Sequence, residues 1–305
     1  MRKSFQISDD EFIDSHTHCG GILLSNLLLR SYPYSQDTMD LIRKMKDNKI
    51  RYSICFPFPI YDIAEKLITP ELYNDLLANE TKAFGKDALL PFAYIRLDDS
   101  LPNQIKHLEK IIQTVPFYGI KIYPPCDTKK ITDDSVNVLL TPFLKEHNFP
   151  IIFHTSFSGN GNPELLLDYA DLHPEIRIML AHAARFNPSA FQRIEKKNNV
   201  FLDCSPLHML CALMNREVSK HNHKILTLPY NNPSEVLFQL AARFTNKLIW
   251  GTDSPCVFLT NFTDNAIVDY SEQFSYENEI KTLRELPAGY APKIANNNTL
   301  KFLFG

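Results

Sequence analysis

Histidine and carboxylate side chains recur at one kind of position in this chain, where a short apolar run ends. His16 and His18 end the run FIDSHTH, His154 ends PIIFH, and Asp253 ends LIWGTD. Imidazole nitrogens and carboxylate oxygens are donors that suit Zn²⁺ and also Fe²⁺, Mn²⁺ and Ni²⁺. These four residues therefore predict a site for one divalent metal ion, with Zn²⁺ as the first choice and one position open to water.

Each of these residues has a simpler explanation when it is taken alone. A single histidine in an apolar run is commonly a core residue with a satisfied hydrogen bond, and one His-x-His pair is a weak signal. The joint pattern is harder to explain in this way, because every member falls at the same end of an apolar run. We therefore interpret the four residues as metal ligands.

Eight short apolar runs alternate with helical patterns along the chain. Each run is rich in β-branched or aromatic residues and has the length of a strand, about 5–8 residues. The runs span 12–19, 51–59, 89–97, 117–124, 150–156, 177–184, 200–206 and 247–255. This alternation predicts parallel strands with right-handed crossovers, and such units close most naturally into a barrel. The expected fold is an α/β (β/α)8 TIM barrel. An open doubly wound sheet is the alternative, but no glycine-rich dinucleotide motif supports it.

Helix signals fill the stretches between these runs. Asn162, Asn187 and Asn232 are each followed by proline, which pairs a helix cap with a first-turn proline. The predicted helices cover 37–48, 69–84, 101–114, 134–147, 163–172, 188–198, 234–245 and 291–305. Two insertions, 20–36 and 207–232, follow the first and seventh strands, and we expect them to form lids or walls of the active site.

A barrel would bring the four predicted ligands together. Side chains two apart on a strand point to the same face, so His16 and His18 both point into the barrel mouth. The eighth strand lies beside the first in a closed barrel and brings Asp253 next to them. His154 approaches from the fifth strand, across the mouth. Barrel enzymes keep their active sites at this end of the strands.

Length and charge narrow the classes of function. The chain has 305 residues and a formal net charge of −3, which suits a single barrel domain over 1–305. The balanced charge gives no reason to expect nucleic acid or an anionic membrane as a partner, and a homodimer remains open. The N-terminal residues lack the apolar segment of a secretory signal, and no apolar run approaches the roughly 18 residues of a membrane helix. Six cysteines without CxxC spacing indicate reduced thiols, so we expect a cytoplasmic protein.

The motifs taken together resemble the amidohydrolase superfamily, and within it the amidohydrolase-related branch that includes aminocarboxymuconate semialdehyde decarboxylase. The matching segments are IDSHTH, GIKIYP, IIFHTS, IMLAHAA, WGTDSP and the ending NNNTLKFLFG, so the resemblance runs from residue 12 to the C-terminus. It implies a distorted barrel with one metal held by His16, His18, His154 and Asp253. It also implies that His182, in IMLAHAA, faces the substrate without ligating this metal.

Other polar side chains near the predicted strand ends are candidates for substrate binding. Lys121 on the fourth strand could bind a substrate carboxylate, or it could point outward toward a helix. In binuclear members of the superfamily a fourth-strand lysine is carboxylated and bridges two metals. Arg96, Arg185 and Tyr123 are further candidates for substrate binding, and ordinary structural roles remain open for them. Asp14 could hydrogen-bond a ligand histidine or cap a loop amide.

The predicted site suits a hydrolase. A divalent metal lowers the pKa of a bound water toward about 7 and polarises a carbonyl. Asp253 would accept the proton of the water and deliver it to the leaving group, while His182 would stabilise the developing oxyanion or shuttle a proton. We expect hydrolysis of an amide, lactone or related ester of a small carboxylate-bearing molecule. Non-oxidative decarboxylation or hydration is the alternative, and a metal-bound binding protein without turnover is a third hypothesis.

Overall fold

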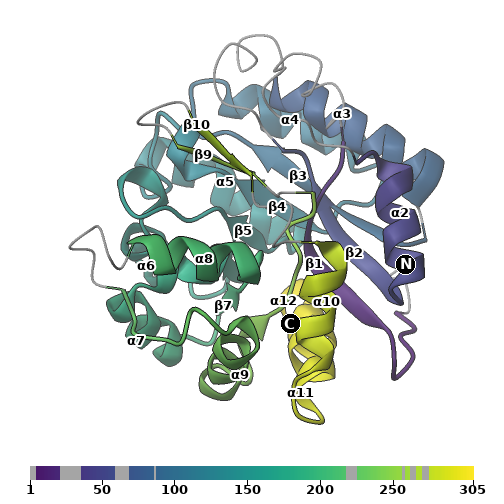
Figure 1. Cartoon of the computed structure of the whole chain (residues 1–305). Helices are drawn as coiled ribbons and strands as arrows, with labels where there is room; N and C mark the ends of the chain where they lie inside the picture. The colour runs from purple at the N-terminus through teal and green to yellow at the C-terminus, as the bar shows by residue number, and fades with distance from the viewer. Residues whose placement is uncertain are drawn as a thin grey trace.

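Eight parallel strands form one sheet whose order follows the order of the strands along the chain (Figure 1). The computed structural model describes residues 5–20, 36–58, 69–85, 87–217, 225–255, 258–261, 266–269 and 275–305. The strands of the sheet are β1 (Phe12–His18), β2 (Ile50–Phe56), β3 (Leu89–Ile95), β4 (Gly119–Ile122), β5 (Ile151–Phe153), β6 (Ile178–Leu180), β7 (Val200–Asp203) and β8 (Leu248–Ile249). Each strand lies within one of the eight predicted runs or begins one residue before it. The predicted barrel topology is therefore confirmed.

The sheet closes through an irregular seam between the segment after β8 and β1. Thr17 and Ser254 form a parallel bridge, and the N–H of His18 donates to the carbonyl of Ser254 at 2.8 Å. Gly251 makes this close approach possible, because a Cβ at this position would lie 2.8 Å from the backbone nitrogen of His16. The barrel is nearly closed and is distorted at this seam, as the resemblance to the amidohydrolase superfamily implies.

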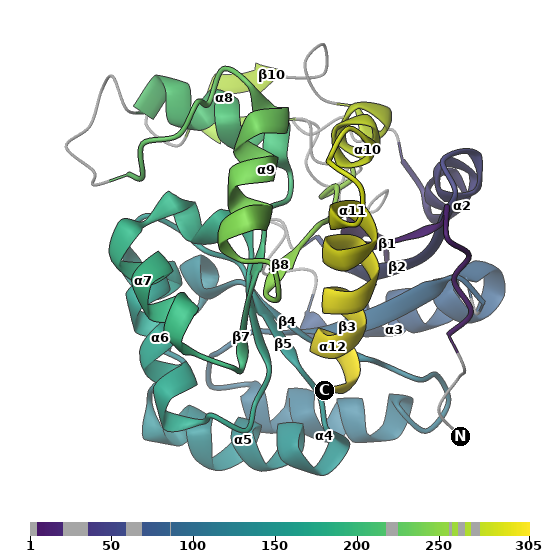
Figure 2. The same cartoon turned by 90° about the horizontal axis from the view of Figure 1, so that it is seen from below.

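Helices surround the barrel in both views (Figures 1 and 2). They are α2 (Thr38–Asp47), α3 (Pro70–Glu80), α4 (Leu101–Ile111), α5 (Asp134–His147), α6 (Pro163–Leu172), α7 (Pro188–Lys196), α8 (Leu207–Glu217), α9 (Pro233–Arg243), α10 (Tyr276–Arg284), α11 (Tyr290–Pro292) and α12 (Asn298–Phe304). The predicted caps Asn162, Asn187 and Asn232 accept hydrogen bonds from first-turn N–H groups of α6, α7 and α9. In the described part of the chain, no helix has the length and apolar character needed to cross a membrane.

The C-terminal helix α12 closes the amino end of the barrel. Phe302 stacks on Phe92 of β3 with ring centroids 6.1 Å apart and meets Phe201 of β7 edge-on at 5.5 Å. The amide of Asn298 donates to the carbonyl of Leu248, at the start of β8. The predicted final helix over 291–305 therefore packs against the barrel, although a π-helical turn separates α11 from α12. The carboxyl ends of the strands are left to form the functional site.

Four elements go beyond the prediction. Helix α8 occupies the first half of the insertion 207–232, for which no helix is predicted from the sequence. Strands β9 (Phe258–Asn261) and β10 (Ala266–Asp269) pair antiparallel after β8, although the sequence between them, FTDN, lacks the glycine of a common hairpin turn. Helix α10 precedes the C-terminal helices. The other insertion, 20–36, lies outside the described residues apart from its two end residues.

Candidate active site

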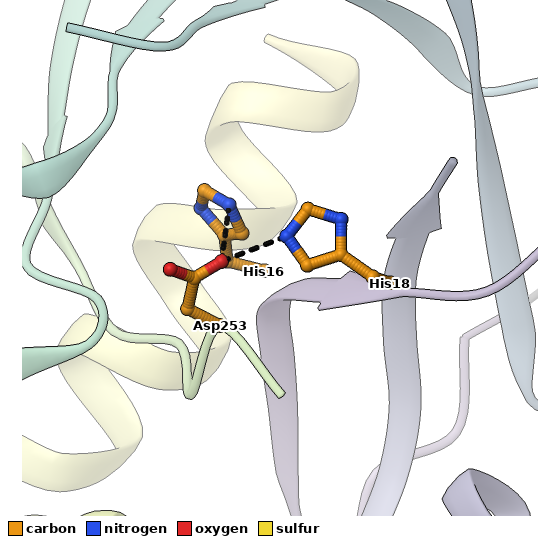
Figure 3. A group of neighbouring side chains, drawn as sticks. All are labelled: His16, His18 and Asp253. Atoms are coloured by element: carbon orange, nitrogen blue, oxygen red, sulfur yellow. Dashed lines mark hydrogen bonds and ion pairs between the residues drawn. The ribbon is translucent and has the colours of Figure 1, made fainter. Parts of the chain in front are cut away.

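Three of the predicted ligands meet where β1 and the segment after β8 lie side by side (Figure 3). His16, His18 and Asp253 each offer one donor atom, and these atoms all lie within 4.8 Å of one another. Oδ1 of Asp253 lies 2.8 Å from Nε2 of His18 and 3.1 Å from Nε2 of His16. All three side chains are buried. The expectation that His16 and His18 point to the same side is confirmed.

The orientation of His16 is set by Asp203 at the end of β7. Nδ1 of His16 donates to Oδ2 of Asp203 at 2.5 Å, which leaves Nε2 to face Asp253. The backbone N–H and the hydroxyl of Ser205 hold the carboxylate of Asp203 at 2.7 and 2.8 Å. A carboxylate of this kind fixes the tautomer of a metal-binding histidine. Asp203 is not among the residues predicted from sequence. It nevertheless ends a strand, in VFLD, much as Asp253 follows a strand in LIWGTD.

Burial and neighbouring charges shift the pKa values of this group. Burial and Lys121 lower the pKa of His16, but Asp253 and Asp203 outweigh them and raise it. Burial lowers the pKa of His18. Burial alone would raise the pKa of Asp253, yet the adjacent histidines hold it well below its usual range. Asp253 is therefore an ionised carboxylate between two imidazoles, and this donor set fits a divalent cation.

His154 and His182 form a second, hydrogen-bonded pair in the same cavity. Nδ1 of His182 lies 2.7 Å from the carbonyl oxygen of Ser205, so this nitrogen carries the proton. Nε2 of His182 then accepts from Nδ1 of His154 at 2.9 Å, and Nη2 of Arg185 lies 3.3 Å from Nε2 of His154. Burial lowers the pKa of both histidines well below the usual value. The pair is therefore neutral, and its hydrogen bonds run in one direction from Arg185 to Ser205.

His154 does not belong to the group of three converging donors. Both of its ring nitrogens face other protein groups, and its ring stacks on Tyr123 with centroids 5.5 Å apart. Its role as a fourth ligand stays a prediction, and ligation would require one of these contacts to be exchanged. His182 lies beside the donors, with Nδ1 at 3.9 Å from Oδ2 of Asp253. Its catalytic role likewise stays a prediction.

A left-handed stretch of backbone carries His182 and Arg185. The residues from His182 to Phe186 have φ angles from 45° to 58°, and none of them is glycine. This region costs an ordinary residue roughly 1–2 kcal/mol, because Cβ approaches the following carbonyl oxygen. Ala183 and Ala184 are fully buried, so packing around them holds the turn in place. The sequence HAARF carries no signal for this conformation.

Two further candidates lie close to the donors. The hydroxyl of Tyr123 donates to the carbonyl of Pro57 at 3.2 Å and lies 3.5 Å from Nδ1 of His18. Lys121 points into the barrel and is fully buried. Its ammonium lies 4.5 Å from the ring centroid of Phe56 and 4.8 Å from that of Tyr123. Lys121 thus adds positive charge beneath the site, and its contact with substrate stays a prediction.

The remaining two candidates make structural contacts. Arg96 pairs with Asp98 at 2.5 Å, and neither residue lines the cavity of the donor group. Asp14 accepts hydrogen bonds from the backbone N–H of His16 at 3.2 Å and of Thr252 at 3.0 Å. Burial raises the pKa of Asp14 to about 7. Of the two roles considered for Asp14, the structure supports capping of a loop amide.

The donors open into a cavity of about 110 Å³. Its polar wall consists of His16, His18, His154, His182, Arg185 and Asp253. Its other wall consists of Phe58, Tyr123, Pro206, Met209, Leu210 and Leu213, of which the last three belong to α8. The expectation that the second insertion forms a wall of the site is therefore confirmed, and helix α8 provides that wall.

A family model accounts for nearly the whole chain. The model described as amidohydrolase matches residues 13–304. The chain belongs to the amidohydrolase family. This membership confirms the resemblance inferred from the motifs.

Solved structures of amidohydrolase relatives share the fold at low sequence identity. A probable 2-pyrone-4,6-dicarboxylic acid hydrolase from Acinetobacter baumannii is 14% identical, with a TM-score of 0.64 and coverage of 96% of this chain and 99% of that one. A 5-carboxyvanillate decarboxylase from Novosphingobium aromaticivorans, complexed with manganese, is 13% identical, with a TM-score of 0.63 and 99% of each chain covered. A 4-oxalomesaconate hydratase from Rhodopseudomonas palustris is 14% identical, with a TM-score of 0.59 and coverage of 96% and 95%. None of the curated proteins compared with the chain matches it.

Proposed function

We propose that this amidohydrolase is a metal-dependent hydrolase of an amide, lactone or related ester in a small carboxylate-bearing molecule. The observation that carries the proposal is the convergence of two imidazole nitrogens and one ionised carboxylate, from His16, His18 and Asp253. The hydrogen bond to Asp203 directs Nε2 of His16 toward the same point. Zn²⁺ is the first choice for this donor set, and Mn²⁺, Fe²⁺ or Ni²⁺ also suit it. His154 is the proposed fourth ligand.

Asp253 can serve both as a ligand and as a base. When bound, a divalent metal lowers the pKa of a water molecule and polarises a carbonyl oxygen. Oδ1 of Asp253 faces the two histidines (Figure 3). Oδ2 lies 3.9 Å from Nδ1 of His182. Oδ2 is thus positioned to accept the proton of the attacking water and to pass it to the leaving group.

His182 is better suited to move a proton than to stabilise an oxyanion. Because Nδ1 donates to Ser205, Nε2 of neutral His182 is an acceptor. An acceptor nitrogen takes up a proton but cannot donate a hydrogen bond to a developing negative charge. Arg185, whose guanidinium reaches His154, is the cation that would bind an oxyanion or a substrate carboxylate in this cavity.

Decarboxylation or hydration is the second candidate reaction. A neutral, proton-accepting His182 also suits proton transfer at carbon, which both lyase reactions require. A 5-carboxyvanillate decarboxylase and a 4-oxalomesaconate hydratase share the fold. A metal-bound binding protein without turnover is the third hypothesis, and the polar residues that line the cavity count against it.

Metal depletion and one substitution test the proposal. Removal of metal with a chelator should abolish hydrolysis of a panel of lactones, amides and esters, and Zn²⁺ or Mn²⁺ should restore it. His182→Asn should keep the metal content of the wild type and reduce turnover by roughly 10²–10⁴-fold, because a positioned proton acceptor is lost. His107→Asn, on the outer helix α4, is the matched control and should change neither quantity.

Elemental analysis and steady-state kinetics give the two readouts. Loss of metal from the His182→Asn protein would contradict the role assigned to His182. A metal-loaded protein that hydrolyses none of the panel, but releases CO2 from acids or hydrates unsaturated ones, would replace the hydrolase by the lyase.

A further inference from the structure

A second cavity shares Arg185 with the metal-site cavity. It has a volume of about 390 Å³ and lies between the loop that follows β5 and the first turn of α7. The residues that matter for its chemistry are Ser156, Phe157, Arg185, Asn187, Ser189 and Gln192. Arg185 also lines the cavity of the metal donors. One cationic side chain therefore borders both spaces.

Three contacts fix the guanidinium of Arg185 at this boundary. Nε donates to the carbonyl oxygen of Thr155 at 2.7 Å, and Nη2 lies 3.3 Å from Nε2 of His154. The guanidinium carbon lies 5.8 Å from the ring centroid of Phe157. His154 lines the first cavity and Phe157 lines the second. The guanidinium therefore extends from one cavity to the other.

The charge of Arg185 is not neutralised within the described part of the protein. None of the described carboxylates forms an ion pair with it, and none of the described groups accepts a hydrogen bond from Nη1. Burial lowers the pKa of Arg185 to about 10, although Asp253 acts in the opposite direction. A partly buried cation without a counter-ion is costly unless a ligand supplies the negative charge.

The helix ends at this cavity do not supply its positive charge. The side chain of Asn162 accepts from the N–H of Glu164 at the start of α6. The side chain of Asn187 accepts from the N–H groups of Ser189 and Ala190 at the start of α7. These caps already occupy the N–H groups of Glu164, Ser189 and Ala190, so Arg185 is the group that would bind an anion.

The acidic side chain beside the cavity does not compete for Arg185. Glu164 pairs with Arg193 at 2.6 Å and accepts a hydrogen bond from the hydroxyl of Ser189. The side chains of Ser156, Asn187 and Gln192 are neutral and polar. The second cavity thus combines one cation with neutral hydrogen-bonding groups.

We propose that the second cavity is a subsite for a carboxylate-bearing arm of the substrate, anchored by Arg185. This inference rests on the proposed function, because the bond to be cleaved would lie at His16, His18 and Asp253. A single guanidinium among neutral groups matches a singly charged carboxylate, which it binds with two parallel hydrogen bonds, better than a doubly charged phosphate. The substrate class is therefore an elongated molecule with a hydrolysable bond at one end and a carboxylate on the other.

The volumes of the two cavities agree with a reacting group in the first and a carboxylate arm in the second. The metal-site cavity, at about 110 Å³, has room for the reacting group and little more. The second cavity, at about 390 Å³, falls in the size range of small-molecule pockets. A substrate that used only the first cavity would leave the second cavity, and the side of Arg185 that borders it, without a ligand.

Binding of straight-chain dicarboxylates tests the subsite without turnover. The metal-loaded protein is titrated calorimetrically with the series from succinate to pimelate, and with the monocarboxylate of each chain length. A dicarboxylate of matching length should bind at least about tenfold more tightly than its monocarboxylate, because it gains a charge-assisted hydrogen-bond pair. Equal affinities throughout the series would overturn the inference.

Gln192 allows a charge test at an exposed position of the cavity. Gln192→Glu should weaken binding of the best dicarboxylate by roughly threefold to tenfold, and Gln192→Lys should strengthen it by a similar factor. Gln113→Glu is the matched control, since this exposed residue lies between α4 and the amino end of β4. It should leave the affinity unchanged.

The outcomes separate this inference from the proposed function. If Gln192→Glu and Gln192→Lys bind the best dicarboxylate with the affinity of the wild type, the subsite is overturned, even when the protein is an active hydrolase. Inorganic phosphate that competes as well as the best dicarboxylate would overturn the assignment to a carboxylate. Absence of hydrolysis, with charge-sensitive dicarboxylate binding intact, would overturn the proposed reaction and support the subsite.

Discussion

Glycine at position 184 should be tolerated far better than glycine at an ordinary buried alanine. Ala184 is fully buried and has a φ of 45°, within the left-handed turn that carries His182 and Arg185. Ala184→Gly removes a buried methyl group, at about 0.8 kcal/mol, and frees the unfolded backbone, at about 0.5–1 kcal/mol. It also relieves left-handed strain of about 1–2 kcal/mol. The free energy of unfolding should therefore change by no more than about 0.8 kcal/mol in either direction.

Ala190→Gly supplies the comparison. Ala190 is equally buried, but it lies in the right-handed helix α7, where glycine relieves no strain. The same two costs should lower the free energy of unfolding by about 1.3–1.8 kcal/mol. Urea unfolding can be followed by far-ultraviolet circular dichroism and by the fluorescence of Trp250, the single tryptophan of the chain. Equal destabilisation by the two substitutions would refute the strained turn.

Two further predictions concern single buried carboxyl groups. Asp203→Asn should weaken metal binding by roughly 10–100-fold, because the carboxylate that orients His16 is lost. Competition with a metallochromic chelator measures the metal affinity. An unchanged affinity would contradict this role of Asp203. Burial raises the pKa of Glu279 to about 8 from a usual value of 4.5, so the folded protein retains a proton that the unfolded chain releases. Stability should therefore fall as the pH rises from about 4.5 to about 8, and Glu279→Gln should remove this loss. Thermal unfolding should show the variant's advantage near pH 9 and little of it near pH 5; an equal advantage at both would speak against the buried proton.

The strands and the donors that depend on strand order were predictable. Alternation of apolar runs with helices determines the topology, and the topology places Asp253 beside His16 and His18. Asp203 could have been found by the same rule, since it also ends a barrel strand. Asp203 contacts His16 and is not itself one of the converging donors, so a search for donor atoms alone does not find it.

Other features depend on information that a single sequence does not carry. The contact between His154 and His182 depends on tautomers that are set by the carbonyl of Ser205, far away along the chain. The left-handed turn is built from alanines, which have no preference for it, so only the packing around them selects that backbone. The apolar residues of helix α8 face the cavity as well as the barrel. Their spacing in the sequence therefore does not distinguish a helix from a loop.

The seam between β1 and the segment after β8 has a consequence for how the protein is made. Asp253 and His18 are separated by 235 positions in the chain, yet they lie in contact. During synthesis β1 leaves the ribosome long before β8. His16 and His18 therefore cannot contact Asp253 until most of the chain has emerged. A nascent or prematurely terminated chain therefore lacks the complete donor group, and the proposed metal would be acquired late, by a finished barrel.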